Sequence, residues 1–174
     1  MTNKKKIYMI VYSGIIAALY VVLTYPMAQF AFGPIQFRLA EVMTILPAYG
    51  FAYVPGISLG CFLANLLNPS NLGPVDIIGG TLATVLAGIF SARLGKKNKN
   101  LAIIPPILFN GIIVGGYLPF LLVDESSEIT VQAVLISMLE VAASEAVLLV
   151  VLGLPLLLLI KKSRRLKELI EKVK

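Results

Sequence analysis

Ionisable and amide side chains are rare in the long apolar runs of this sequence, and they are the residues that could do chemistry. The set that we single out is Arg38, Glu41, Asn65, Asp76, Asn110, Tyr117, Glu140 and Glu145. Ionisable groups are costly inside a membrane span and are usually functional there. With one arginine against four carboxyls, the set predicts an acidic or proton-sharing pocket. A neutral or cationic ligand rich in hydrogen-bond donors is therefore expected, rather than a phosphorylated or polycarboxylate ligand.

Several members of this set also have simpler structural explanations. Arg38 and Glu41 are spaced by three residues and could pair with each other on a helix. Asp76 could cap a helix N-terminus. Asn65 could be a helix-end residue, and Asn110 could join two helices through hydrogen bonds. Structural and ligand-binding roles both stay open for these residues.

Glu140 and Glu145 differ in their expected depth. Counted from Ile129 at about 1.5 Å per residue, Glu140 lies about 16 Å and Glu145 about 24 Å along the last apolar run. A carboxyl as deep as Glu145 needs a partner, a proton or a ligand. We therefore favour a ligand-related role for Glu145 and give Glu140 less weight.

The composition excludes several kinds of catalysis. The chain has no histidine, which removes Ser-His and Cys-His catalysis and histidine metal sites. The single cysteine, Cys61, has no partner for an intramolecular disulfide and is expected to pack as a small hydrophobe. No P-loop sequence is present, so work against a gradient would need a partner or ions. We expect no catalytic residue and no cofactor.

The elements that must position these side chains are membrane helices. Of the 174 residues, 58% are hydrophobic and only 14% are charged, and the mean hydropathy is +0.90. Soluble domains are about a quarter charged. The chain is therefore predicted to be a polytopic membrane protein, with room for roughly six or seven spans of about 20 residues.

The positive charge indicates how those spans are oriented. A net charge of +6 could indicate a nucleic-acid partner, but the basic residues cluster at 4–6, 93–99 and 161–167, beside apolar runs. Positive loops stay in the cytoplasm. All three clusters are then on one side, with an even number of spans between neighbouring clusters, and no nucleic-acid partner is expected.

The apolar runs predict an all-α bundle of six transmembrane helices with both termini in the cytoplasm. The expected spans are residues 7–25, 38–49, 54–67, 75–94, 101–123 and 129–160, followed by an amphipathic cytoplasmic tail at 161–174. Residues 1–174 would form one transmembrane domain. This topology places the polar set at similar depth, in the outer half of the bundle.

Small residues on the first span are a separate signal. Ser13 and Ala17, and likewise Gly14 and Ala18, are spaced by four residues, an arrangement that lets helices approach closely. These residues either pack within the bundle or dock another membrane subunit.

Several short motifs distributed from Phe37 to Leu156 together identify a family. They are Phe37-Arg38-Leu39-Ala40-Glu41, Leu46-Pro47, Pro55-Gly56, Gly60-Cys61, Ala64-Asn65-Leu66-Leu67, Asp76 with Gly79-Gly80-Thr81-Leu82-Ala83-Thr84, Pro105-Pro106 with Asn110 and Val114-Gly115, and Ser144-Glu145 with Leu152-Gly153-Leu154-Pro155-Leu156. With these motifs the sequence resembles the QueT family, the substrate-binding S components of energy-coupling factor (ECF) transporters for queuosine precursors.

The resemblance implies a non-enzymatic, six-helix S component in a prokaryotic plasma membrane. Its ligand would be a 7-deazaguanine such as queuine or preQ1. Its partners would be a transmembrane coupling protein, the T component, and two ATPase subunits, on which the loaded S component topples. The small residues of the first span match the family's docking face, and the segment Pro26 to Phe37 would close over the site.

The chemistry of the ligand agrees with the carboxyl and amide groups. A guanine-like ring presents N1–H and a 2-amino group side by side, and one carboxylate, Glu145 or Glu140, can accept both hydrogen bonds. Asparagine offers a donor and an acceptor together, which suits Asn65 and Asn110 to other ring edges.

The remaining contacts stay open. The aminomethyl cation of preQ1 would pair with Asp76 or Glu41. Arg38 would meet the ring carbonyl or hold Glu41 in place. Stacking on the ring would come from Phe37 or Tyr117.

Three other functions compete with this interpretation. The first is an S component for another vitamin-like ligand. The second is an intramembrane enzyme that uses carboxylates, which the missing histidines and the lack of an adjacent Glu-Glu pair disfavour. The third is a proton-coupled carrier that works alone, which is disfavoured because no internal repeat is visible.

Overall fold

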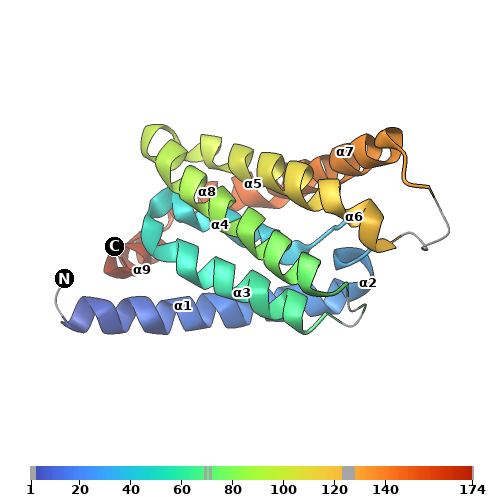
Figure 1. The fold of residues 1–174 in the computed structure, drawn as a ribbon. Helices are drawn as coiled ribbons and strands as arrows, with labels where there is room; N and C mark the ends of the chain where they lie inside the picture. Colours follow the sequence, from blue (N-terminus) through green and yellow to red (C-terminus); the bar gives the residue numbers. More distant parts are fainter. Residues whose placement is uncertain (1–2, 69, 71, 123–127, 174) are drawn as a thin grey trace.

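The chain forms a bundle of helices in a computed structural model that describes residues 3–68, 70, 72–122 and 128–173 (Figure 1). These residues contain no β-strand, which confirms that the fold is all-α. The start of α1 (Asn3–Thr24) and the last helix, α9 (Arg164–Val173), lie at the same end of the bundle. The opposite end carries α2 (Ala28–Ala31) and the start of α7 (Val131–Leu148).

The other elements follow the apolar runs of the sequence. In chain order they are η1 (Tyr25–Met27), η2 (Leu39–Tyr49), η3 (Phe51–Tyr53), α3 (Val54–Leu66), α4 (Pro74–Lys97), η4 (Lys99–Ile103), α5 (Ile104–Phe109), η5 (Asn110–Val114), α6 (Gly115–Leu122), α7 (Val131–Leu148), η6 (Leu149–Gly153) and α8 (Leu154–Lys162). The segments η5 and η6 are single π-helical turns inside long helices. Such turns occur frequently at functional sites.

Within the described residues, four helical segments are long and apolar enough to cross a membrane. They are Lys6–Thr24, Pro74–Lys97, Lys99–Leu122 and Val131–Lys162. Two shorter apolar helices, Leu39–Tyr49 and Phe51–Leu66, occupy the positions of the predicted second and third spans. Each of the six predicted runs is therefore mostly helical in the described residues, while six membrane crossings and their orientation stay predictions.

The second apolar run, η2, is a 3-10 helix of 11 residues. Because a 3-10 helix rises about 2.0 Å per residue instead of 1.5 Å, this short run reaches about 22 Å. Side chains three residues apart are in line in such a helix. Glu41 and Thr44 consequently share its buried side, and the Thr44 hydroxyl donates to the Glu41 carbonyl oxygen at 2.6 Å.

Glycines let neighbouring helices approach closely. A Cβ added at Gly60 of α3 would lie 2.5 Å from the Cβ of Tyr20 in α1. A Cβ added at Gly115 of α6 would lie 2.5 Å from the Cα of Met138 in α7. These distances are far shorter than van der Waals contact, so a larger residue at either place forces the helices apart.

The outer surface of the bundle is apolar. Ile10, Ile78 and Leu139 lie on three different long helices and are 72%, 68% and 70% exposed. Contiguous apolar surface of this kind is rare on soluble monomers. The arrangement fits helices that face lipid, as the composition predicts.

Candidate functional site

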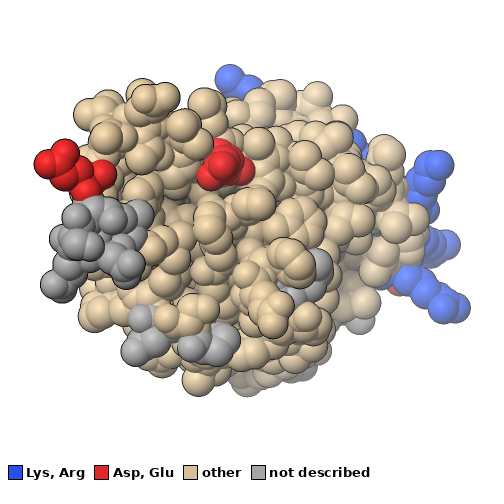
Figure 2. Space-filling view, turned by 90° about the vertical axis from the view of Figure 1, so that its right-hand side faces the viewer, with Lys and Arg blue, Asp and Glu red and all other residues tan. Residues whose placement is uncertain are grey.

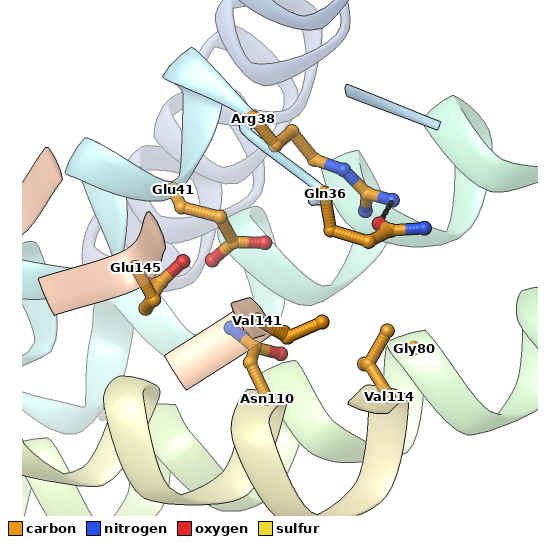
Figure 3. Close-up of a pocket in the computed structure, with 8 residues that line it drawn as sticks. All are labelled: Gln36, Arg38, Glu41, Gly80, Asn110, Val114, Val141 and Glu145. Carbon is orange, nitrogen blue, oxygen red and sulfur yellow. Dashed lines mark hydrogen bonds between the residues drawn. The ribbon is translucent and has the colours of Figure 1, made fainter. Parts of the chain in front are cut away.

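A small polar cavity lies between the helices and is lined in part by the segment that joins α2 to η2 (Figure 3). Its volume is about 10 Å³, which is room for about one water molecule. It is lined by Gln36, Arg38, Glu41, Gly80, Asn110, Val114, Val141 and Glu145. Four of the residues that the sequence singled out, Arg38, Glu41, Asn110 and Glu145, are therefore brought together from three distant parts of the chain.

Glu41 is anchored through only one side of its carboxyl group. The Tyr20 hydroxyl of α1 donates a hydrogen bond to Glu41 Oε1. Glu41 is 4% exposed, and its Oε2 has no hydrogen-bond partner among the described residues. One oxygen is thus fixed by the bundle and the other is available to a ligand in the cavity.

Arg38 is held by neutral groups rather than by a carboxylate. Its Nη2 donates to Gln36 Oε1 at 3.0 Å, its Nη1 lies 3.7 Å from Cys61 Sγ, and its guanidinium carbon lies 5.0 Å from the centre of the Phe32 ring. Among the described residues no ion pair joins Arg38 to Glu41. Arg38 and Glu41 therefore do not form a direct ion pair in this structure.

Gln36 also lines the cavity, although it is not among the residues predicted from the sequence to bind a ligand. Its side chain points toward the guanidinium of Arg38 (Figure 3), is buried, and leaves Nε2 without a partner in the described part of the chain. Its backbone φ of 52° lies in the left-handed region, which residues other than glycine seldom adopt. The sequence feature that could have indicated Gln36 is its position two residues before Arg38, the one arginine in an apolar region.

Glu145 enters the cavity from α7, opposite Arg38. It is 4% exposed, and its Oε1 has no partner among the described residues. Asn110, the first residue of the π turn η5, points toward Glu41 and Glu145 (Figure 3). Because buried polar atoms normally find hydrogen-bond partners, the free oxygens of two carboxyls around one cavity are a chemical feature that needs explanation.

A second buried polar cluster, formed by Asn65, Asp76 and Tyr117, adjoins the cavity at Gly80. The Tyr117 hydroxyl donates to Asp76 Oδ1 at 2.8 Å, and Asn65 Nδ2 donates to the Asp76 carbonyl oxygen at 3.0 Å. A Cβ at Gly80 would lie 2.6 Å from Asn65 Nδ2. The Asp76 side chain does not cap α4, whose N-cap residue is Gly73. Asn65, Asp76 and Tyr117 therefore support the wall of the cavity rather than line it.

Glu140 does not reach this cavity. It is exposed on α7 and lines a separate cavity with Ser137 and Leu118. Val141, the next residue, faces the polar cavity instead.

The described residues contain no group of three or more Cys, Asp or Glu side chains that could hold a metal ion.

The small residues of α1 divide into two faces. A Cβ added at Gly56 of α3 would lie 3.0 Å from the Cα of Ser13, and one added at Gly60 would lie 3.1 Å from the Cα of Ala17. Ser13 and Ala17 therefore pack within the bundle. Gly14 and Ala18 are exposed on the outer face of α1.

The predicted amphipathic tail forms α9 and folds back on the bundle. Leu166, Leu169 and Ile170 border an apolar groove of about 310 Å³ beside α1 and α8. The Tyr53 hydroxyl donates to the Ile170 carbonyl oxygen at 3.2 Å. The apolar side of the tail thus contacts the protein, while Arg165 and Lys167 are exposed.

Charge is separated between the two ends of the bundle. Apart from Arg38, every lysine and arginine lies in residues 4–6, 93–99 or 161–174. Figure 2 faces the end opposite the described chain termini and shows acidic side chains there, with lysine and arginine only at its margins. The cavity lies on the acidic side of this division.

Comparisons with known proteins identify the family. The profile of a family described as QueT transporter matches residues 10–162. The "Queuosine precursor transporter QueT" of Lactococcus lactis subsp. cremoris is 36% identical over 86 residues, which cover 48% of this chain and 49% of that protein. The match thus spans about half the length of the curated relative. No solved structure matches the chain. Since the profile covers most of the sequence, the chain belongs to the QueT transporter family.

Proposed function

We propose that the chain is the substrate-binding S component of an ECF importer and captures a queuosine precursor from outside the cell. The observation that carries this proposal is the set of buried, unpartnered atoms around one cavity: Gln36 Nε2, Glu41 Oε2 and Glu145 Oε1. Leaving such groups without partners costs free energy. A ligand with hydrogen-bond donors for the carboxyls and an acceptor for the amide would supply the missing partners.

A 7-deazaguanine has this pattern of donors and acceptors. Its N1–H and 2-amino group would donate to Glu145, and its ring carbonyl would accept from Gln36 or Arg38. The aminomethyl cation of preQ1 would pair with the free oxygen of Glu41. Asn110 supplies both a donor and an acceptor to the remaining edge. The "queuosine precursor" in the name of the lactococcal relative supports the same class of ligand.

The cavity must open before it can accept a base, because about 10 Å³ holds little more than one water molecule. We propose that the segment Pro26–Phe37 is the part that moves. It carries Gln36, whose left-handed backbone is a conformation that persists only when its surroundings hold it. Contacts of Gln36 and Phe32 with Arg38 would hold the segment closed.

The remaining features of the proposal concern topology and partners. Residues 1–174 would form one domain with six spans, and both termini would lie in the cytoplasm of a prokaryotic cell, as the basic end of the bundle supports. Import would need a transmembrane coupling protein and two ATPase subunits, with toppling of the loaded S component. The chain itself would have no enzymatic activity.

Native mass spectrometry of the protein purified from its host tests the ligand assignment. We expect retained mass that matches a deazaguanine, and rebinding of preQ1 or queuine in preference to guanine after the ligand is removed. Co-purification of ATPase subunits would support the importer. A folded protein that binds none of these bases would contradict the substrate assignment and leave only the membrane architecture.

A substitution on α1 tests the docking surface. An added Cβ at Gly14 meets nothing within 4 Å, so Gly14→Leu is expected to leave folding and ligand binding intact. A bulky residue on a face that must approach another helix closely prevents that approach. We therefore expect at least a tenfold loss of co-purified ATPase subunits. Ala143→Leu, at an exposed position of α7, is the matched control, and equal losses in both variants would contradict the assignment of Gly14 and Ala18.

A further inference from the structure

A second cavity adjoins the polar cavity on the acidic side of the molecule. Its volume is about 270 Å³, close to the lower end of the range for small-molecule pockets. It is lined by Pro34, Leu118, Pro119, Leu122, Ser137 and Glu140. The carboxyl of Glu140 makes no hydrogen bond or ion pair with the described residues.

No residue lines both cavities, but neighbouring residues of the same elements line the two. Glu140 precedes Val141, which lines the polar cavity, and Leu118 lies one helical turn beyond Val114, which also lines it. Pro34 is in the same loop as Gln36. A ligand in the second cavity would therefore touch both helices and the loop that enclose the first.

The electrostatic field of this end of the molecule favours cations. Arg38 is the one basic residue of the sequence outside residues 4–6, 93–99 and 161–174, and it is 6% exposed. Glu128 and Glu140 are exposed, and Figure 2 shows acidic groups on this face without lysine or arginine across its centre. A surface with one sign of charge raises the local concentration of ligands of opposite charge and their association rate.

We propose that the second cavity is an entrance site for planar bases that carry a cationic substituent, with Glu140 as the counter-ion. A base would bind there first, through contacts with the exposed side chains of Pro34 and Leu122 and the charge of Glu140. It would pass to the polar cavity when the segment Pro26–Phe37 opens. This inference rests on the proposed function, and it makes the association rate depend on the charge of the ligand.

Association kinetics of two ligands with the purified protein test this entrance site. The probes are 7-aminomethyl-7-deazaguanine, a cation, and 7-cyano-7-deazaguanine, which is neutral. One unit charge about 5 Å away in water changes a rate about fourfold. We expect Glu140→Gln to slow association of the cation about fourfold at low ionic strength, with an unchanged dissociation rate and an unchanged rate for the neutral base. The difference should shrink as salt is added.

Glu128→Gln is the matched control, because Glu128 is exposed on the same end but lines neither cavity. We expect it to change the association rate of the cation less than Glu140→Gln does. Equal effects of the two variants, or an equal slowing of both ligands by Glu140→Gln, would overturn the entrance site while the ligand assignment stands. A folded wild-type protein that binds neither base would overturn the proposed function and this inference with it.

Discussion

Replacing Glu145 with glutamine is expected to weaken binding of a 7-deazaguanine by at least about 100-fold. A carboxylate accepts hydrogen bonds from both N1–H and the 2-amino group of the ligand. A glutamine amide can accept from only one of these two groups, and its NH2 group would face the other donor. The change removes one hydrogen bond to a charged group, which contributes about 1.5–3 kcal/mol, and leaves a ligand donor unpaired, which costs about 1–3 kcal/mol more. Together these losses correspond to about 100-fold or more. Isothermal titration calorimetry with the protein in detergent or nanodiscs measures this change directly.

Two comparisons make the Glu145 result specific. Glu140→Gln should change the equilibrium affinity by no more than about fivefold, because only one nearby charge is lost. An analogue without the 2-amino group should bind the wild type more weakly but lose less on Glu145→Gln, as coupled groups do in a double-mutant cycle. If the affinity of the Glu145→Gln variant is within threefold of the wild-type affinity, Glu145 does not bind the ring edge, and Glu41 or Asn110 would be assigned that contact.

Replacing Gly115 with alanine is expected to cause one of the larger losses of stability among single methyl additions to the glycines of this chain. The new Cβ would lie 2.5 Å from the Cα and 2.9 Å from the backbone nitrogen of Met138, and backbone atoms cannot rotate away as a side chain does. Forcing a methyl group into a packed interface costs about 1–3 kcal/mol. Thermal unfolding in detergent should show a midpoint lower by roughly 4–10 °C.

Gly14→Ala is the matched control for Gly115→Ala. Both changes add one methyl group to a helical glycine, but the Cβ at Gly14 meets nothing within 4 Å. Since alanine is a better helix former than glycine, the midpoint should stay the same or rise. If Gly115→Ala and the wild type unfold at the same midpoint temperature, the close contact of α6 with α7 is contradicted.

The helical runs were predictable from the sequence because their signal is local. Apolar length, proline and charge clusters mark the segments that the structure forms, including the short pair at Leu39–Tyr49 and Phe51–Leu66. The 3-10 form of η2 and the π turns η5 and η6 were not predictable in this way. Their hydrogen-bond patterns depend on how neighbouring helices pack, which composition does not encode locally.

The site was predictable in its residue types but not in its geometry. Arg38, Glu41, Asn110 and Glu145 stand out because polar groups are rare in apolar runs. Glu140 stands out equally, but five residues on a helix rotate it by about 140° from Glu145, and small differences in helix register decide which one faces the cavity. Gln36 lies in a loop, where no periodic pattern indicates the direction of a side chain.

The same limit applies to the small residues of α1. Ser13 and Ala17 have the same spacing as Gly14 and Ala18, and the pairs are shifted by one residue. One residue is about 100° on a helix, enough to turn one pair into the bundle and the other outward. Only the positions of Gly56 and Gly60 in α3 distinguish them.

The closed polar cavity has a consequence for how tightly any ligand appears to bind. Only the fraction of molecules with an open cavity can accept a ligand, and the apparent dissociation constant equals the intrinsic constant divided by that fraction. A closed conformer that dominates therefore lowers the measured affinity in proportion to its population, however well the carboxyls fit the base. Contacts such as Gln36 with Arg38 then set the occupancy of the receptor at low external concentrations, as well as the time for which a bound molecule is retained.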